Sequence, residues 1–145
     1  MTFRAEPGPG SATGRELFDL PDAPRPDPGV DAPVRFLPEL DNLLIAHADR
    51  TRVISEEHRR ALTSPNGVLP GTFLAGGRVA GTWSVMRERL DPGLARARRE
   101  LATLVVRPFD PLDATTRSSV TTEGERLVRF VADDAADHRV TVVQP

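Results

Sequence analysis

The sequence holds 145 residues, which suits one folded domain, and its 39% hydrophobic content can supply a core. A formal net charge of −2 excludes a global positive field that would steer the protein to nucleic acid or to an acidic membrane, so a nucleic-acid contact requires a local basic patch. The sequence has no cysteine, no apolar run near the roughly 20 residues of a membrane span and no secretory signal, so we expect a soluble cytoplasmic protein without disulfides or thiolate chemistry.

The N-terminal part is rich in proline and glycine. It predicts a flexible segment at 1–33, followed by a single α+β domain at 34–145. Within the segment, "TFR" (2–4) and "RELFDL" (15–20) favour two strands of a hairpin around a long turn. If so, the chain begins almost on a strand, which is an unusual start for an intact domain.

The next elements are short. "VRFLPEL" (34–40) predicts a strand that Pro38 breaks. "LDNLLIAHA" (40–48) fits either a short helix or a buried extended run. "SEEHRRAL" (55–62) predicts a helix, because the Ser55 hydroxyl can accept from free N–H groups of the first turn.

The clearest hairpin has the two glycines at 76–77 as its turn, since glycine adopts positive φ at no steric cost. Closing that turn places Leu74 opposite Val79 and Phe73 opposite Ala80. The same alternation puts Trp83 and Val85 on the face of Val79, and Trp83 is expected to fill the core.

The C-terminal half predicts a buried strand, "LATLVV" (101–106), then a long amphipathic helix at 113–134 with Asp113 as its N-cap, and a last strand, "HRVTVVQ" (138–144). The helix carries an apolar stripe, and Glu125 precedes Arg129 by four residues, the spacing of a helical ion pair. The predicted fold class is α+β: a small, mostly antiparallel sheet with a central Gly-Gly hairpin, the long helix and one or two short helices.

A polar cluster follows the first strand of the domain. Asp41, His47 and Asp49 have no spacing typical of a metal site, and no nucleophile motif accompanies a pairing of Asp49 with His47 as general base. Two interpretations remain open. Asp41, Asn42, His47 and Asp49 form a structural polar network, or Arg50 and Arg52 beside them contact phosphate.

The most basic stretch is "RERLDPGLARARR" (87–99), which links two predicted strands. Its arginines include Arg96, Arg98 and Arg99. Such a loop is typical either of a solvated surface or of contact with a phosphate backbone. No aromatic residue is interspersed, so base stacking on this loop is not expected.

Five blocks of the sequence carry a resemblance to a known family. They are, in chain order, "GRELFDLPDAP", "VRFLPELDNLLIAHADRTRVI", "NGVLPGTFLAGGRVAGTW", "ATLVVRPFDPL" and "EGERLVRFVA". Together they resemble, from Gly14 to about Ala132, the bacterial winged-helix DNA-binding domain family related to the alkylpurine and crosslink-unhooking DNA glycosylases.

The resemblance implies a role in DNA repair and a C-terminal position in the family's longer architecture of tandem winged helices. It also implies an N-terminally truncated or split family member. The family's Gln-x-Gln or Gln-x-Asp catalytic motif has no counterpart, because Gln144 is the sole glutamine. We therefore assign no catalytic residue, no metal and no cofactor, and expect the chain to have no glycosylase activity of its own.

The resulting expectation is weak, non-specific binding of double-stranded DNA. The residues expected to contact phosphates are Arg50, Arg52, Arg96, Arg98 and Arg99. The alternative is a structural or interaction module that docks on winged-helix domains of a separate chain.

Overall fold

The computed structural model describes residues 2–4, 16–18, 22, 24, 27, 29–62, 67–90 and 100–145. The chain divides into two compact units, Met1–Val30 and Asp31–Pro145. In the first unit, β1 (Thr2–Arg4) pairs antiparallel with β2 (Glu16–Phe18), with Phe3 opposite Leu17. The hairpin expected from the sequence at this end is therefore confirmed.

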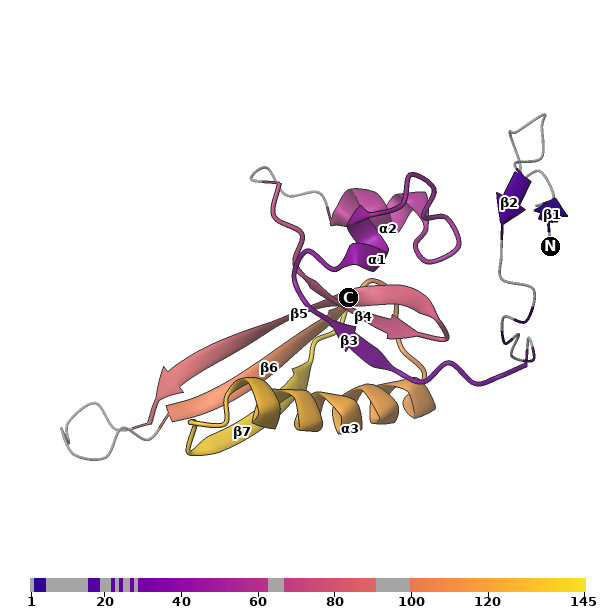
Figure 1. Cartoon of the computed structure of the whole chain (residues 1–145). Coiled ribbons are helices and arrows are strands. Elements are labelled where there is room, and N and C mark those ends of the chain that lie inside the picture. Colours follow the sequence, from indigo (N-terminus) through magenta and orange to yellow (C-terminus); the bar gives the residue numbers. More distant parts are fainter. Residues whose placement is uncertain are drawn as a thin grey trace. The chain divides into compact units, whose positions relative to one another are not determined.

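The second unit is an α+β domain built on a five-stranded sheet (Figure 1). The strand order follows the sequence, and every neighbouring pair is antiparallel except the last, in which β6 and β7 run parallel. The strands are β3 (Arg35–Leu37), β4 (Gly71–Ala75), β5 (Arg78–Arg89), β6 (Glu100–Pro108) and β7 (Asp137–Val142). The predicted fold class, with its central Gly-Gly hairpin, is confirmed.

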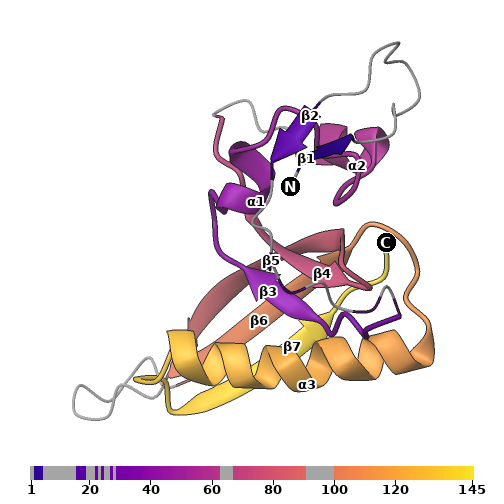
Figure 2. The ribbon, with the colours of Figure 1, turned by 45° about the vertical axis from the view of Figure 1, so that its right-hand side comes forward.

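The long helix α3 (Ala114–Val131) lies along one face of this sheet, whereas α1 (Asn42–Ile45) and α2 (Glu56–Ala61) lie on the opposite side, as two views agree (Figures 1 and 2). Asp113 caps α3 as predicted, since its carboxylate accepts from the backbone N–H of Thr116 at 2.8 Å. No helix in the described part of the chain is both long and apolar enough to cross a membrane.

The apolar stripe of α3 faces the main core. Val120, Gly124 and Val128 are buried against side chains of the sheet such as Leu104, which is 0% exposed. The predicted ion pair between Glu125 and Arg129 does not form. Instead Arg126 bonds Glu123 one turn earlier, at 3.2 Å, so the i,i+3 spacing is used.

The hairpin of β4 and β5 contains a β-bulge that the sequence did not reveal. Leu74 lies opposite Val79 as predicted, but Phe73 lies opposite Gly81 rather than Ala80. The extra residue in β5 shifts the alternation, because side chains on a strand point to opposite faces with a period of two. The prediction that Trp83 shares a face with Val79 is therefore wrong.

Two hydrophobic clusters result from this shift. Trp83 and Val85 pack against the main core under α3, and the expectation that Trp83 fills the core is confirmed. Val79 joins a second cluster with Leu44, Ile54 and Leu62, which secures α1 and α2 to the other side of the sheet. The bulge thus allows one strand to serve both cores.

Candidate nucleic-acid interface and adjoining pocket

The stretch after β3 begins with a short capped helix. The Asp41 carboxylate accepts from the N–H of Leu43 at 2.8 Å and thereby caps α1, which runs for a single turn and ends when Ala46 donates to the carbonyl of Asn42. The Asn42 side chain is exposed. Asp41 therefore stabilises α1 through its side chain, and Asn42 through its backbone carbonyl.

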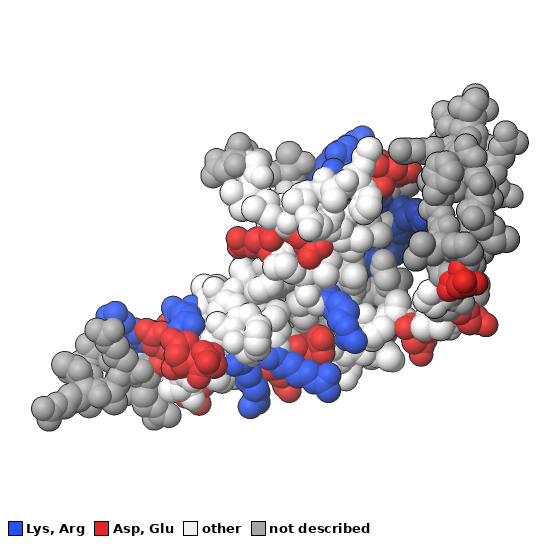
Figure 3. Space-filling model, in the orientation of Figure 1, with Lys and Arg blue, Asp and Glu red and all other residues white. Residues whose placement is uncertain are grey.

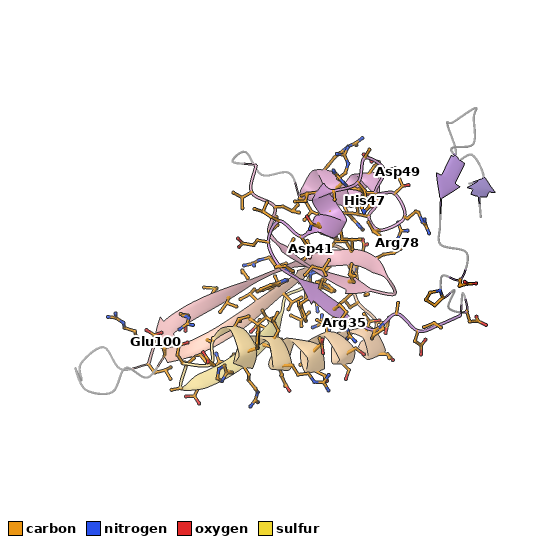
Figure 4. All side chains as sticks on the ribbon, viewed as in Figure 1. Arg35, Asp41, His47, Asp49, Arg78 and Glu100 are labelled. Atoms are coloured by element: carbon orange, nitrogen blue, oxygen red, sulfur yellow. The ribbon has the colours of Figure 1, made fainter. Side chains whose placement is uncertain are left out.

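Asp49 closes a separate turn. Its carboxylate accepts from the N–H of Thr51 at 2.9 Å and from the Thr51 hydroxyl at 2.7 Å. These hydrogen bonds, together with the nearby charge of Arg52, lower the pKa of Asp49 below its ordinary value. His47 lies between the two turns and is exposed, and the described residues give its ring no hydrogen-bond partner. Of the four predicted polar residues, Asp41 and Asp49 thus stabilise two separate local turns; Figure 4 labels them together with His47.

The loop at 49–54 is attached to the β4–β5 hairpin by Arg78. Its guanidinium donates to the carbonyls of Arg52 at 3.0 Å and Thr51 at 3.2 Å. A backbone hydrogen bond from Val79 to Val53, at 2.7 Å, strengthens the attachment. Arg78 is therefore the residue that presents this loop, and sequence reasoning missed it, because nothing in the spacing shows that the hairpin packs beside the loop.

The two predicted phosphate contacts in this loop differ in environment. Arg52 is exposed, and Asp49, whose carboxylate is close enough to interact with its charge, accepts hydrogen bonds from Thr51. Arg50 is partly buried and donates to the carbonyl of Ile45 at 3.4 Å. The other three predicted contacts, Arg96, Arg98 and Arg99, lie outside the described residues.

Charge is mixed over the described surface. Figure 3 shows acidic and basic residues interspersed around a broad uncharged region on the face it presents. Several arginines are joined to carboxylates; Arg35 lies 3.5 Å from Glu123, and Arg87 bonds Asp134 at 2.8 Å. The described face in view therefore carries no extended basic field, and a DNA contact there would depend on a few side chains.

A pocket of about 420 Å³ opens beside the loop. Its floor consists of the second hydrophobic cluster, with Leu44, Ile54 and Leu62 at most 5% exposed. Three aliphatic side chains on its lining remain about half exposed: Leu40 at 53%, Ile45 at 49% and Val68 at 50%. Aliphatic side chains thus form both the floor and part of the rim of the pocket.

Two arginines supply the charge of this pocket. Arg59 donates to the Glu56 carboxylate through Nε at 3.1 Å and Nη2 at 2.9 Å. The Nε of Arg50 is buried and has no hydrogen-bond partner among the described residues. A buried donor without an acceptor is costly, so Arg50 is the side chain of the pocket that gains most from a hydrogen-bond acceptor.

The rim residue Leu40 has an unusual backbone. Its φ of 57° is in the left-handed region, which non-glycine residues adopt at a cost, and it is the one described non-glycine residue with positive φ. Its N–H donates to the carbonyl of Leu69 at 3.3 Å. Three residues earlier, the carbonyl of Leu37 accepts from the Trp83 indole at 2.9 Å, which fixes the approach to this turn.

The described residues offer no metal site, since they contain no group of three or more His, Asp or Glu side chains placed to hold an ion. The other two histidines have structural contacts. His58 lies 3.2 Å from Asp110 and stacks on Phe109, and His138 hydrogen-bonds the carbonyl of Ala132 at 2.7 Å.

Comparison with protein-family models gives the class of the protein. The model "DNA glycosylase AlkZ-like" matches residues 2–130, most of the chain, so the chain belongs to the AlkZ-like DNA glycosylase family. No curated protein matches the sequence significantly.

A solved structure supports the fold. The chain is similar to the Streptomyces sahachiroi DNA glycosylase AlkZ, with a TM-score of 0.55 and 23% sequence identity. The match covers 78% of this chain but 26% of that enzyme, so the chain spans about a quarter of the length of this relative. At this identity the likeness establishes the fold alone.

Proposed function

We propose that the chain is a DNA-binding component of an AlkZ-like repair protein that grips the phosphate backbone of duplex DNA through arginines and performs no bond cleavage by itself. The observation that carries this proposal is the family match over residues 2–130. Such a role places the protein with DNA in the cytoplasm of a bacterial cell, alongside winged-helix domains.

The contacts we assign are those of Arg50, Arg52, Arg96, Arg98 and Arg99. The geometry around Arg52 supports its part: the side chain is exposed, and Arg78 anchors the loop that carries it. A guanidinium on an anchored loop loses less side-chain entropy when it engages a phosphate. Phosphate contacts position a protein without reading sequence, so the binding is non-specific.

Two observations support the non-catalytic part of the proposal. Gln144 is the one glutamine of the sequence. His47, the candidate general base, is exposed and has no described carboxylate hydrogen-bonded to it. An imidazole without an orienting partner is poorly placed to abstract a proton. We therefore assign cleavage of the glycosidic bond to residues outside this chain.

The test is a fluorescence-anisotropy titration of a duplex with the full chain at two or more salt concentrations. We expect a Kd of about 10⁻⁴–10⁻⁶ M near physiological salt, with log K falling by about 0.9 per phosphate contact as log salt rises. Arg52→Gln, and Arg96, Arg98 and Arg99 changed together to Gln, should each weaken binding and reduce that slope.

The matched control is Arg126→Gln, which removes an exposed arginine of α3 that is bonded to Glu123. It should leave binding unchanged. No binding at low salt, or an equal loss in the control, contradicts the proposal. Release of a modified base by the chain alone would contradict the non-catalytic part.

A second function is supported by a different observation. The aliphatic side chains of Leu40, Ile45 and Val68 surround one pocket and remain about half exposed. Clustered exposed apolar side chains mark surfaces that bind other proteins. This favours the alternative of a module that docks on winged-helix domains of a separate chain.

A further inference from the structure

The pocket beside α1 and α2 has the features of a protein-docking site. Its floor is the closed second core, and its rim consists of Leu40, Ile45 and Val68. A volume of about 420 Å³ falls in the range of specific binding sites and holds a large aliphatic side chain with room for a neighbouring polar group. Docking there would remove the three half-exposed side chains from water.

The charge of the pocket defines what must accompany that side chain. The Nε of Arg50 is buried without an acceptor among the described residues, and the one hydrogen bond from its Nη2 is long, at 3.4 Å. A guanidinium in this state gains most from a carboxylate, because a charge-assisted hydrogen bond to Nη2 would replace the long one and the negative charge would offset the positive charge of the partly buried group. Glu56 accepts hydrogen bonds from Arg59 and interacts with Arg50 through charge, so Arg50 keeps its hydrogen-bonding capacity for a ligand at the pocket.

The backbone at the rim points in the same direction. Leu40 has a φ of 57°, yet its side chain is 53% exposed. Burial of the side chain therefore offsets little of the energy cost of the strained backbone. Strained backbone that the surrounding structure enforces is concentrated at binding sites. Here the Trp83–Leu37 hydrogen bond fixes the chain before Leu40, and the Leu40–Leu69 hydrogen bond fixes Leu40 itself.

The lining also selects among classes of partner. The described residues around the pocket include no aromatic ring on which a nucleobase could stack. Aliphatic walls with one guanidinium suit a protein segment instead. We propose that this pocket binds a segment of a partner protein that inserts an aliphatic side chain and pairs an adjacent Asp or Glu carboxylate with Arg50.

Arg50 is shared with the phosphate contacts proposed above, but the rim residues Leu40, Ile45 and Val68 belong to this pocket alone, so variants of the rim let the two proposals fail separately. A panel of short peptides tests it. Each peptide carries leucines, and its members differ only in having aspartate, asparagine or lysine beside them. Binding is measured on the isotope-labelled full chain by NMR, which reports both affinity and the amides that respond.

The acidic peptides should bind and shift the amides of Leu40, Ile45, Arg50 and Val68. Exchange of aspartate for asparagine should weaken binding about tenfold or more, the loss expected for a hydrogen bond to a charged group. Failure of every acidic peptide, equal binding of the lysine peptides, or shifts that map elsewhere would overturn the proposal.

Leu40→Asn provides a variant that should still fold, because asparagine tolerates positive φ. It should weaken peptide binding about tenfold while the melting temperature and the affinity for duplex DNA stay unchanged. Arg50→Met should weaken the binding of the aspartate peptide until its affinity equals that of the asparagine peptide, because the guanidinium that distinguishes the two is gone. The control is Phe130→Asn, which removes another exposed hydrophobic side chain, 82% exposed, from α3.

Two other occupants are separate outcomes that count against the proposal. Sedimentation would reveal a dimer that Leu40→Asn dissociates, if a second copy fills the pocket. Duplex DNA would shift the amides of the rim residues Leu40, Ile45 and Val68, and Leu40→Asn would weaken that binding, if the pocket belongs to the DNA interface.

Discussion

The Trp83 indole lies over Gly71 and donates to the carbonyl of Leu37 at 2.9 Å, so a side chain of β5 reaches across β4 to secure the end of edge strand β3. A Cβ on Gly71 would lie 2.6 Å from the indole Cε2 atom. Glycine at this position is therefore what permits the crossing, and the crossing positions the turn that leads to the pocket.

Gly71→Ala should displace the indole and break its hydrogen bond to Leu37, because the added methyl cannot share its space. Trp83 is the single tryptophan of the sequence, so fluorescence reports on it alone. We expect a red-shifted emission and a loss of about 1–3 kcal/mol of stability. Unchanged emission would show that the ring does not depend on Gly71.

Thr72→Val should stabilise the protein. Thr72 is 0% exposed and its hydroxyl has no hydrogen-bond partner among the described residues. Valine keeps the shape of the side chain and removes the desolvated polar group, a gain of about 1 kcal/mol. Chemical denaturation measures it. A lower unfolding free energy would mean that the hydroxyl is satisfied in solution.

Leu104→Ala should destabilise the protein by about 3 kcal/mol, since it leaves a cavity at the centre of the main core. Met86→Ala on neighbouring β5 is the control, because Met86 is 49% exposed and its truncation should change stability by less than about 1 kcal/mol. Equal effects in denaturant titrations would contradict the placement of the core under α3.

Acid should weaken the domain through its aspartates. The hydrogen bonds from Thr116 lower the pKa of Asp113, so its contribution is complete above the usual aspartate value of about 3.9 and is lost as the pH falls through the lower folded value. Asp113→Asn keeps an N-cap acceptor that does not titrate. Its melting temperature should therefore fall less steeply below about pH 4 than that of the wild type.

Arg87→Lys should lower the melting temperature by a few degrees. Arg87 donates to both oxygens of Asp134 at 2.8 Å, and lysine cannot reproduce that bidentate geometry. Asp134→Asn should cause a similar loss. The double variant should be little worse than either single one, because both remove the same interaction. Strict additivity in thermal denaturation would contradict the pairing.

The sequence predicted most of the elements because their signals are local. Asp113 and Ser55 could be assigned as N-caps, and Pro38 as the end of a strand, from the residues themselves. The register of β4 with β5 could be predicted only as far as the bulge. An extra residue costs little and has no sequence mark, so its position depends on which core each side chain joins.

The candidate site was harder to predict because it depends on contacts between distant residues. Arg78 reaches the carbonyls of Thr51 and Arg52 across more than twenty positions. The pocket needs Leu40, Arg50 and Val68 to meet, and hydrophobic periodicity carries no information about such a meeting. The polar residues at 41–52 could be predicted as a candidate site from their types, whereas the half-exposed aliphatic residues beside them could not.

The two outer strands of the sheet bear on how the domain behaves at high concentration. Strand β3 has Arg35 at its start and is followed by Pro38, and β7 carries Asp137 and Arg139 among its exposed residues. Charges and proline on border strands oppose the addition of further strands from other molecules. The domain should therefore resist aggregation through the edges of its sheet, even at high concentration.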